Sequence, residues 1–572
     1  MLPFYDFEVF KYDWLVVIID PVTKEETVIV NDIEKLTAYY EAHKNEIWCG
    51  YGNRHYDQYI LKGLLCGFDP FRISDFIISL NEAGYKFSKL LNKFSMINFD
   101  VGLLDKSLKQ LEGFQGHNIH ESNVDFKIDR KLTQAEIDET ITYCRNDVKE
   151  TINVFLECKS EFDALLGLVN MFQLPLTAMN YTKAQISAEI LGCETTKFND
   201  EWDLVFLPCI VLNKYSFVKD WFENPDNQSE KMERIVNVCG VPHTFGLGGL
   251  HGAIPQYHHK CEPDELMLHV DVASYYPSLM IYWNLLTRAS KHPERFKEIY
   301  DLRLKLKHEG KKKEQAPLKI VLNGTFGICK DKKSKAYDPR TASSICINGQ
   351  LLLLDLLEKL EEVPSFNLIQ SNTDGLIIKI KAKDFEAVDD ICYEWEHRTK
   401  MNLEFDYIKE IFQKDVNNYI FIQFDGKIER KGGYVKELSA IDNDLPIINK
   451  AITDCILHGI SPEKTILECD SLIMFQKIVK LTKKYRSVLH NGIEYSNKCY
   501  RVFASNRYED GPILKCKLFK GHERKDKPAN TPDHCFIDNS DIQNAKIPKN
   551  LDKNWYVALA KERLHQFGIE VI

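Results

Sequence analysis

The sequence predicts a multidomain α+β protein, on the evidence of its length, its composition and its mixed apolar patterns. At 572 residues, the chain is long enough for three or four domains. Apolar residues make up 44% and charged residues 28%, which are ordinary values for a globular protein. Strand patterns at the N-terminus and helical patterns after them recur in mixed order along the chain.

Composition excludes several classes of protein. No apolar run reaches membrane-spanning length and the first ten residues lack a basic signal region, so we expect a cytoplasmic protein with no membrane partner. The 16 cysteines include no C-x-x-C pair, which argues against a zinc module or a disulfide framework.

Charge is distributed unevenly along the chain. The formal net charge is -10. Residues 1–150 hold 17 Lys and Arg against 25 Asp and Glu, whereas residues 471–572 hold 19 against 11. A metal-binding acidic end and a phosphate-binding basic end would explain this pattern, as would two solvated surfaces.

The N-terminal segment predicts three strands, near residues 4–10, 14–19 and 26–30. Asp6 and Glu8 lie two apart on the first strand, so both side chains project from one face. A loop after a further short strand carries Asn53, Tyr56 and Asp57, and a helix that begins near a Thr133 capping box carries Tyr143 and Asp147. Tyr143 and Asp147 share a helix face because they are four residues apart.

Asp6, Glu8, Asp57 and Asp147 together suit a two-metal phosphodiesterase site. Two hard cations can share carboxylate oxygens and stabilise the attacking and the leaving oxygen atoms. Tyr143 would then orient the attacking water. The alternative is a set of carboxylates on a solvated rim.

A second candidate site begins at Asp271. Residues 266–270 form a short apolar run, and Pro277 requires the predicted strand to end before it. A carboxylate at the mouth of such a strand, with backbone carbonyls beside it, is a suitable Mg²⁺ ligand. An aspartate that caps the next helix is the alternative.

Two helices are predicted next, over residues 294–309 and 315–326, with a break at a glycine and three lysines between them. Arg303 and Lys307 lie one turn apart on the first helix, and Lys319 and Asn323 lie one turn apart on the second. Directed at one place, Arg303, Lys307 and Lys319 would bind a triphosphate. A solvated lysine-rich hairpin is the alternative.

Residues 366–380 predict two apolar strands joined at Asp374-Gly375. The turn is either purely structural or presents Asp374 at a strand tip, as Asp271 is presented. In the second case the two carboxylates would hold a metal pair for in-line phosphoryl transfer.

Two further stretches have a composition of interest. Residues 245–252 are glycine-rich without the lysine of a P-loop, which suits either close approach to another polymer or a flexible connector. Lysines and aromatics alternate in residues 483–486 and 515–520, as expected for a salt-sensitive, sequence-independent grip on a DNA duplex backbone.

Taken together, these stretches resemble the family B DNA polymerases with a 3'–5' exonuclease, especially the compact bacteriophage enzymes. The stretches similar to the exonuclease motifs are Asp6-x-Glu8, Asn53-x-x-Tyr56-Asp57 and Tyr143-x-x-x-Asp147. The stretches similar to polymerase motifs A, B and C are Asp271-x-x-Ser274-Tyr275-Tyr276-Pro277, Lys319-x-x-x-Asn323-Gly324-Thr325-Phe326-Gly327 and Thr373-Asp374. The stretch Ser107-Leu108-x-x-Leu111 resembles a motif with which the family contacts single-stranded DNA.

The resemblance implies an RNase-H-like exonuclease domain and a right-hand polymerase module with palm, fingers and thumb. The implied domains are the exonuclease at 1–165, a connecting region with the start of the palm at 166–262, the palm at 263–292 and 331–450, the fingers at 293–330 and the thumb at 451–572.

The resemblance also implies roles for single residues. The catalytic set would be Asp271, Asp374, Asp6, Glu8, Asp57, Tyr143 and Asp147. The same carboxylates and the Val272 carbonyl would hold two Mg²⁺ ions per site, for which Mn²⁺ can substitute. The dNTP would be held by Tyr276, Arg303, Lys307, Lys319 and Asn323, with Tyr276 excluding a 2'-hydroxyl. DNA would be contacted by Asn53, Tyr56, Ser107, Leu108 and Tyr419.

The chain departs from the family pattern at several positions. Asn372 stands where motif C has a first acidic residue, which leaves one carboxylate in that turn. Gly375 and Gly324 stand where the family has serine.

Two basic positions of the family also differ. A primer-contacting K-x-Y is matched only by Asn417-Asn418-Tyr419, with Lys414 or Lys427 as the substitute cation. Glu121 stands near the place of a catalytic lysine in phage relatives.

We therefore expect a DNA-dependent DNA polymerase with a proofreading exonuclease that replicates a phage genome. Its partners would be primed template DNA, dNTPs and replication accessory proteins, and it would act as a monomer in the cytoplasm, that of the host cell if phage-encoded. One alternative, suggested by Asn372, is an exonuclease whose decayed polymerase half only holds DNA. The other is a noncatalytic DNA-binding replisome protein, against which the retained carboxylates argue.

Overall fold

The computed structural model describes residues 2–103 and 105–570, which fold into two compact units. The first unit consists of the described residues up to Tyr181, with Leu438–Ala451 and Pro462–Leu559. The second consists of Thr182–Glu437, Ile452–Ser461 and the described residues from Ala560 onward. Each unit is therefore built from segments that are far apart in the sequence.

A five-stranded sheet with strand order β3-β2-β1-β4-β5 forms the N-terminal part of the first unit. Its strands are β1 (Phe4–Val9), β2 (Trp14–Ile19), β3 (Glu26–Val30), β4 (Trp48–Gly50) and β5 (Asn98–Asp100). The predicted meander of the first three strands is confirmed by antiparallel pairing. Tyr5 and Phe7 pack in the core around Trp48, so the alternating Asp6 and Glu8 face the other side of the sheet.

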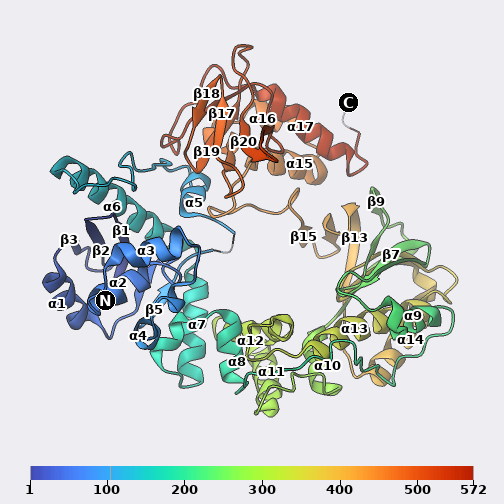
Figure 1. Ribbon diagram of the computed structural model, residues 1–572. Coiled ribbons are helices and arrows are strands. Elements are labelled where there is room, and N and C mark those ends of the chain that lie inside the picture. Colours follow the sequence, from blue (N-terminus) through green and yellow to red (C-terminus); the bar gives the residue numbers. More distant parts are fainter. Residues whose placement is uncertain (1, 104, 571–572) are drawn as a thin grey trace. The chain divides into compact units, whose positions relative to one another are not determined.

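Helices surround this sheet, and α6 packs against β1 and β2 (Figure 1). They are α1 (Ile33–His43), α2 (Asp57–Leu65), α3 (Pro70–Ile78), α4 (Lys89–Lys93), α5 (Leu108–Phe114), α6 (Gln134–Glu157) and α7 (Lys159–Met171). The predicted start of α6 is confirmed, because Thr133 and Glu136 form a reciprocal capping box. This start fixes the register that directs Asp147 toward β1.

Residues 462–559 complete the first unit with two small sheets and a short helix. The elements are α16 (Pro462–Leu467), β16 (Lys477–Lys480), β17 (Ser487–His490), β18 (Ile493–Tyr495), β19 (Cys499–Ala504), β20 (Leu514–Phe519), β21 (His522–Asp526) and β22 (Cys535–Ile537). The buried Arg501 on β19 donates to the backbone oxygens of Gly113 (3.3 Å) and His117 (2.7 Å) at the end of α5. The C-terminal sheets are thereby fixed to the N-terminal part of this unit.

A ten-stranded sheet is the frame of the second unit, in the order β15-β14-β13-β10-β12-β11-β8-β7-β6, with β9 paired to β13. Its strands are β6 (Glu233–Val238), β7 (Val241–Gly246), β8 (His251–Ala253), β9 (Tyr257–Lys260), β10 (Glu265–Val272), β11 (Asn367–Ser371), β12 (Gly375–Lys381), β13 (Leu403–Asp415), β14 (Asn418–Gln423) and β15 (Ile428–Lys431). The apolar strand predicted at residues 266–270 is confirmed as the central β10.

The helices of the second unit are α8 (Lys183–Ile190), α9 (Ser216–Glu223), α10 (Tyr275–Tyr282), α11 (Pro293–His308), α12 (Lys312–Lys330), α13 (Pro339–Leu360) and α14 (Phe385–Thr399). α13 is almost wholly buried and contacts α10, α12 and α14. Two more helices, α15 (Pro446–His458) and α17 (Lys553–His565), are each divided between the units. Within residues 2–103 and 105–570, no helix is both long and apolar enough to cross a membrane.

The predicted break between α11 and α12 is wrong in its extent. Gly310, with φ at +71°, ends the first helix as expected. Lys312 and Lys313 already belong to the first turn of α12, because lysine is a good helix former and needs no break.

Candidate functional site

Asp271 and Asp374 meet on neighbouring strands, and we call them the carboxylate pair. Asp271 lies opposite Gly375 in the antiparallel pairing of β10 with β12. The backbone N–H of Val272 donates to the Asp374 carbonyl at 2.7 Å. A Cβ at position 375 would lie 2.8 Å from the Asp271 carboxylate, so glycine leaves room for that carboxylate where the family pattern has a side chain.

The alternative of Asp271 as a helix cap is excluded. Asp271 lies within β10, and α10 begins only at Tyr275 with Ser274 as its N-cap residue. Ser274 has φ at +51°, an uncommon conformation for a residue other than glycine. This left-handed residue turns the chain sharply from the strand into the helix.

Negative charge is concentrated around Asp271. Burial, followed by the charges of Asp374, Glu404 and Glu429, raises the pKa of Asp271 to about 7. Glu404 lies directly opposite Asp271 in the pairing of β10 with β13. Sequence reasoning missed Glu404, because nothing local indicates that β13 pairs with β10.

A cavity of about 350 Å³ brings most of the predicted residues of this site together. Among its lining residues are Asp271, Val272, Tyr276, Arg303, Lys319, Asn323 and Asp374. Arg303 is held in place by Gln315 (Nε to Oε1, 3.2 Å) and by Ser274 (3.4 Å). Lys307 does not line the cavity, and its ammonium lies 3.5 Å from the Glu404 carboxylate.

Tyr276 is packed between two helices. Its ring centroid lies 4.7 Å from that of Phe326 on α12. A Cβ at Gly349 on α13 would lie 3.2 Å from the Tyr276 ring, so a larger residue there would press on it. The neighbouring Tyr275 donates its hydroxyl to the Gly349 carbonyl at 2.6 Å. The Tyr276 ring is therefore a rigid wall of the cavity.

The glycine-rich stretch 245–252 is held by hydrogen bonds next to this site. The buried Gln350 of α13 donates to the carbonyls of Gly246 (2.6 Å) and Gly248 (2.9 Å) and accepts from the Gly246 N–H (3.1 Å). A Cβ at Gly249 would lie 2.2 Å from Thr373 Oγ1, next to Asp374. Only a bare backbone can lie this close to the turn.

The turn that carries Asp374 is longer than the predicted Asp-Gly pair. β11 ends before Asn372 and β12 begins at Gly375. The Asn372 side-chain oxygen accepts from the Thr373 N–H at 2.8 Å, and the Asn372 backbone N–H donates to the Gly375 carbonyl at 2.8 Å. Asn372 thus closes the turn through hydrogen bonds that need no negative charge.

The structure places a third lysine, Lys431, beside Tyr419, in addition to the predicted Lys414 and Lys427. Lys414 is paired with Asp415 at 2.5 Å, and Lys427 lies in the turn before β15. Lys431 lies opposite Tyr419 in the pairing of β14 with β15, with its ammonium 5.8 Å from the Tyr419 ring centroid. Its charge also acts on Asp271. The place of Lys431 beside Tyr419 depends on the register between the strands, which the sequence does not reveal.

The N-terminal carboxylates form a second site, which we call the N-terminal cluster: Asp6, Glu8, Asp57 and Asp147. Ligand atoms of Asp6, Glu8 and Cys144 lie within 4.8 Å of one another. Burial, followed by the neighbouring carboxylates, raises the pKa values of Asp6 and Glu8 well above their usual range. Burial also raises the pKa of Asp57 to about 7, although its carboxylate accepts from the Phe7 N–H at 3.1 Å.

Lys109 is a member of this second site that sequence reasoning missed. Its ammonium donates to Asp147 and, at 2.8 Å, to Glu112, and lies 4.6 Å from the Tyr143 ring centroid. Burial nevertheless raises the pKa of Glu112 to about 8, so Lys109 mainly neutralises Asp147 near neutral pH. In the sequence, Lys109 occupies a variable position of the Ser107-Leu108-x-x-Leu111 motif, so the motif did not single it out.

Glu121 has hydrogen-bond partners in the C-terminal sheets. Its carboxylate accepts from the backbone N–H groups of Lys498 and Cys499 (3.3 Å for the latter). Glu121 therefore fixes the C-terminal sheets to the N-terminal part of the first unit.

The residues predicted to contact DNA in the first unit differ in exposure. Asn53 is fully buried and exchanges hydrogen bonds with Asn98 (2.9 and 3.0 Å), so it holds its loop to β5. Ser107 is the N-cap of α5 and Leu108 is half-buried in its first turn. Tyr56 donates to or accepts from Ser74 at 2.8 Å and lines a cavity of about 540 Å³ that also reaches Glu8.

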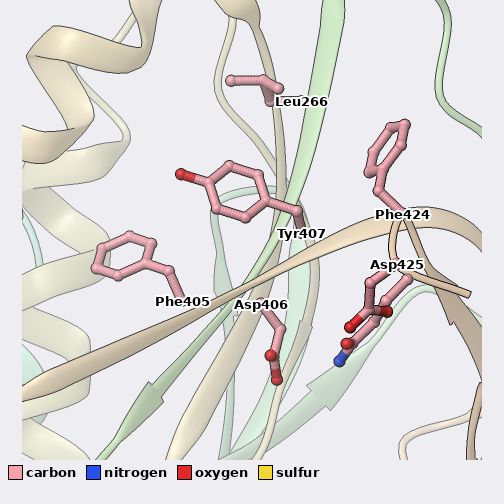
Figure 2. A pocket seen from close by; sticks show the side chains of 7 residues that line it. Leu266, Phe405, Asp406, Tyr407, Phe424 and Asp425 are labelled. Atoms are coloured by element: carbon pink, nitrogen blue, oxygen red, sulfur yellow. The ribbon is translucent and has the colours of Figure 1, made fainter. Parts of the chain in front are cut away.

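Another cavity, of about 500 Å³, lies on the other face of the large sheet (Figure 2). Figure 2 shows Tyr407 beside Leu266 and Phe405, with the Asp406 carboxylate directed away from the Tyr407 ring. Leu266 and Asp271 are five residues apart on β10 and so face opposite sides of the sheet. This aromatic pocket is therefore separate from the carboxylate pair.

Both carboxylate sites fit divalent cations. Each holds carboxylates close together, and burial with the neighbouring negative charges raises the pKa of Asp6 in one site and of Asp271 in the other. Hard cations such as Mg²⁺ prefer oxygen ligands of this kind. The residues available are Asp271, Asp374 and the Val272 carbonyl in one site, and the N-terminal cluster in the other.

Stability should depend on pH and on cations together. The folded pKa of Asp271, about 7, lies above its ordinary value of 3.8, so the folded chain binds the extra proton between these values. Without metal, the melting temperature should therefore rise as pH falls from about 8 to about 5. Added Mg²⁺ should raise it more at about pH 8 than at about pH 5, because protons compete for the same oxygens. Thermal melts in EDTA and in Mg²⁺ measure both.

The matched control is Asp389→Asn, at an exposed carboxylate on α14. It should preserve the full pH and Mg²⁺ effects, whereas Asp271→Asn and Asp57→Asn should each weaken them. Equal stabilisation by Mg²⁺ at both pH values would contradict the assignment.

Comparisons with known proteins give a relative by sequence and likenesses by structure. No family model matches the chain. Over 210 residues the chain is 26% identical to DNA polymerase 1 of Aeropyrum pernix, which covers 30% of this chain and 22% of that protein. The match thus spans about a fifth of the relative's length. The family B DNA polymerase from the hyperthermophilic archaeon Pyrobaculum calidifontis aligns over 100% of this chain and 78% of that one, with 13% identity and a TM-score of 0.42.

Proposed function

We propose that the chain is a DNA-dependent DNA polymerase. The observation that carries this proposal is the 350 Å³ cavity, in which the carboxylate pair faces Arg303, Lys319 and Asn323. Carboxylates for metals on one side and cations for phosphates on the other are what nucleotidyl transfer requires. The sequence match to a protein named DNA polymerase 1 supports the same reaction.

In this mechanism, the primer 3'-hydroxyl attacks the α-phosphorus of a dNTP and pyrophosphate leaves. Divalent cations bound by Asp271, Asp374 and the Val272 carbonyl would supply Lewis acidity at the reacting oxygens. Lys319 and Arg303 would bind the triphosphate, with the guanidinium already oriented by Gln315. Gly375 lets the Asp271 carboxylate lie close to the Asp374 turn.

We also propose a 3'–5' exonuclease in the N-terminal cluster. Four carboxylates from β1, α2 and α6, three of them buried and Asp6 half-buried, support a two-metal phosphodiesterase together with Tyr143. Tyr143 would orient the attacking water, and Lys109 would hold Asp147 ionised and in place. The 3'-terminal phosphodiester would be cleaved to release a nucleotide monophosphate.

Finer assignments follow from the same proposal. The exonuclease would have an RNase-H-like fold at 1–165, and the palm, fingers and thumb would follow the boundaries given above. Strands β6 to β8 join the large sheet, which supports a share of the palm for the region 166–262. A compact phage-type enzyme that works as a cytoplasmic monomer with accessory proteins completes the proposal.

The two alternatives predict different outcomes of one experiment. Wild-type protein is incubated with a 5'-labelled primed template and Mg²⁺, with and without dNTPs. Extension with dNTPs and shortening without them are expected. Shortening without extension would favour the decayed polymerase. Binding with neither reaction would favour the noncatalytic protein. The hydrogen bonds of Asn372 support an intact site, because they preserve the Asp374 turn without a second carboxylate.

Tyr276 should discriminate against ribonucleotides. Tyr276→Ala should lower the preference for dNTPs over rNTPs by roughly 10- to 200-fold, the range for one steric contact. Tyr276→Phe should keep the preference, since the ring packed on Phe326 is the barrier. Steady-state incorporation of single nucleotides measures the ratio, and the exposed Tyr393→Ala is the control. Unchanged discrimination in Tyr276→Ala would remove this role.

A further inference from the structure

The first unit carries a surface on which cations and aromatics gather, which we call the basic–aromatic face: Lys484, Tyr485, Lys515, Lys517, Phe519 and Arg524. The two lysine-rich stretches noted in the sequence meet here because β17 pairs with β20, and β20 with β21. Lys515, Lys517 and Phe519 alternate along β20 and therefore share one side of the sheet. Arg524 lies opposite Lys517 on β21.

Positive charge on this face exceeds negative charge. The ammonium groups of Lys484, Lys515 and Lys517 lie 5.1, 5.6 and 5.1 Å from the Tyr485 ring centroid. Asp526 accepts from Tyr485 (2.9 Å) and contacts Lys517 (2.5 Å) and Arg524 (2.9 Å).

Two of these lysines have no counter-ion within the described part of the chain. Among the residues that the structure describes, neither Lys484 nor Lys515 has a carboxylate partner within salt-bridge distance. Burial and the nearby charges of Lys477 and Lys484 lower the pKa of Lys515. Lysines held together with less negative than positive charge around them, in a chain of net charge -10, are suited to an anionic ligand.

An exposed aromatic tip adjoins this charge. β20 and β21 are joined by a tight turn at Lys520 and Gly521, which both have positive φ. Phe519 is 52% exposed and Leu518 is 67% exposed just before that turn. An exposed ring on the same side of β20 as Lys515, with the Lys520 ammonium 5.7 Å from the ring centroid, matches the two parts of a single-stranded nucleic acid, a stackable base and a phosphate.

The residue before the face contacts the segment after α3, within the first unit. Lys483 donates to the Asn81 side chain at 3.0 Å, just after α3. Residues of α3, among them Phe71 and Ile78, line the 540 Å³ cavity that reaches Glu8. A strand whose 3' end lies at Glu8 can therefore follow this cavity and α3 toward Lys483.

We propose that the basic–aromatic face binds the single-stranded DNA whose 3' end is delivered to the N-terminal cluster. The phosphates would contact Lys484 and Lys515, and a base would stack on Phe519. Delivery of the bound strand to the N-terminal cluster rests on the proposed exonuclease. The binding of the strand to the face does not. Binding of a single strand differs from binding of a duplex backbone because it requires the exposed aromatic ring.

Fluorescence anisotropy tests the binding with a labelled oligo-dT of about 20 nucleotides, in EDTA so that no cleavage occurs. The triple variant Lys484→Ala/Lys515→Ala/Phe519→Ala should raise Kd by at least about tenfold, and Phe519→Ala alone should still raise it. The control Lys44→Ala/Lys89→Ala removes two exposed lysines of the same unit and should leave Kd unchanged. Circular dichroism checks that each variant is folded.

Competitors define the ligand. Unlabelled single strand should displace the probe better than duplex of equal length, and vesicles of anionic lipid should not displace it. Loss of preference for single strand, or better displacement by vesicles, would overturn the proposal, as would unchanged Kd in the folded triple variant.

Catalysis separates this proposal from the proposed exonuclease. With Mg²⁺ and subsaturating oligo-dT, the triple variant should degrade this long substrate more slowly than wild type does. It should degrade a trinucleotide at the wild-type rate, because a trinucleotide is too short to reach the face. If wild type binds as expected but degrades nothing, the exonuclease fails and the binding face stands. If wild type degrades DNA and the triple variant degrades both substrates normally, the face fails and the exonuclease stands.

Discussion

Replacing Asp374 by alanine is expected to slow primer extension by about 1,000-fold or more. The carboxylate lies beside Asp271 at the end of paired strands, where one metal ligand is worth several kcal/mol of transition-state stabilisation. Single-turnover extension of a labelled primer by one nucleotide measures the rate. Shortening of the primer without dNTPs should continue at the wild-type rate, because the N-terminal cluster belongs to the other unit.

Asp389→Ala is the matched control for this loss, since it removes an exposed carboxylate from α14. It should extend primers normally. Asp374→Asn keeps the shape of the side chain and should be nearly as inactive as alanine, because charge and not volume is required. Extension by Asp374→Ala within tenfold of wild type would remove this residue from catalysis.

Replacing Lys109 by methionine is expected to weaken both the stability and the activity of the N-terminal cluster. The buried Asp147 would lose its ammonium partner, and breaking a buried ion pair costs about 3–5 kcal/mol. Hydrogen exchange of the α5 and α6 amides measures the local unfolding free energy. Degradation of single-stranded DNA should fall roughly 10- to 100-fold, as for other partners of metal ligands.

The loss of stability caused by Lys109→Met should depend on pH. Without the ammonium, the Asp147 pKa rises further, so the folded variant gains a proton as pH falls. The destabilisation should therefore be smaller at about pH 6 than at about pH 8. Lys149→Met, at an exposed lysine on α6, should change neither exchange nor degradation. Equal protection of α6 in wild type and Lys109→Met would contradict the buried pairing.

The sequence predicted those parts of the fold and the sites that depend on local signals. The Thr133 capping box placed the start of α6, and the apolar run before Asp271 placed β10. The helical spacing of Lys319 and Asn323 was sufficient to bring both to one cavity.

What could not be predicted depends on which distant strands and helices pair. Glu404 faces Asp271 only because β13 pairs with β10, and Lys431 reaches Tyr419 only through the register of β15. The role of Gln350 needs α13 to pass behind the glycine-rich stretch. Lys109 was visible in the sequence, but its importance depends on the approach of α5 to α6.

Arg501 and Glu121 have a consequence for the order of events during synthesis. They fix residues near the end of the chain to α5 and its neighbours, and the first unit is interrupted by most of the second. A ribosome therefore releases the whole large sheet before it supplies the partners that complete the N-terminal half. Contacts over such long loops form slowly. The N-terminal part of the first unit should therefore complete its packing only after the large sheet has been synthesised.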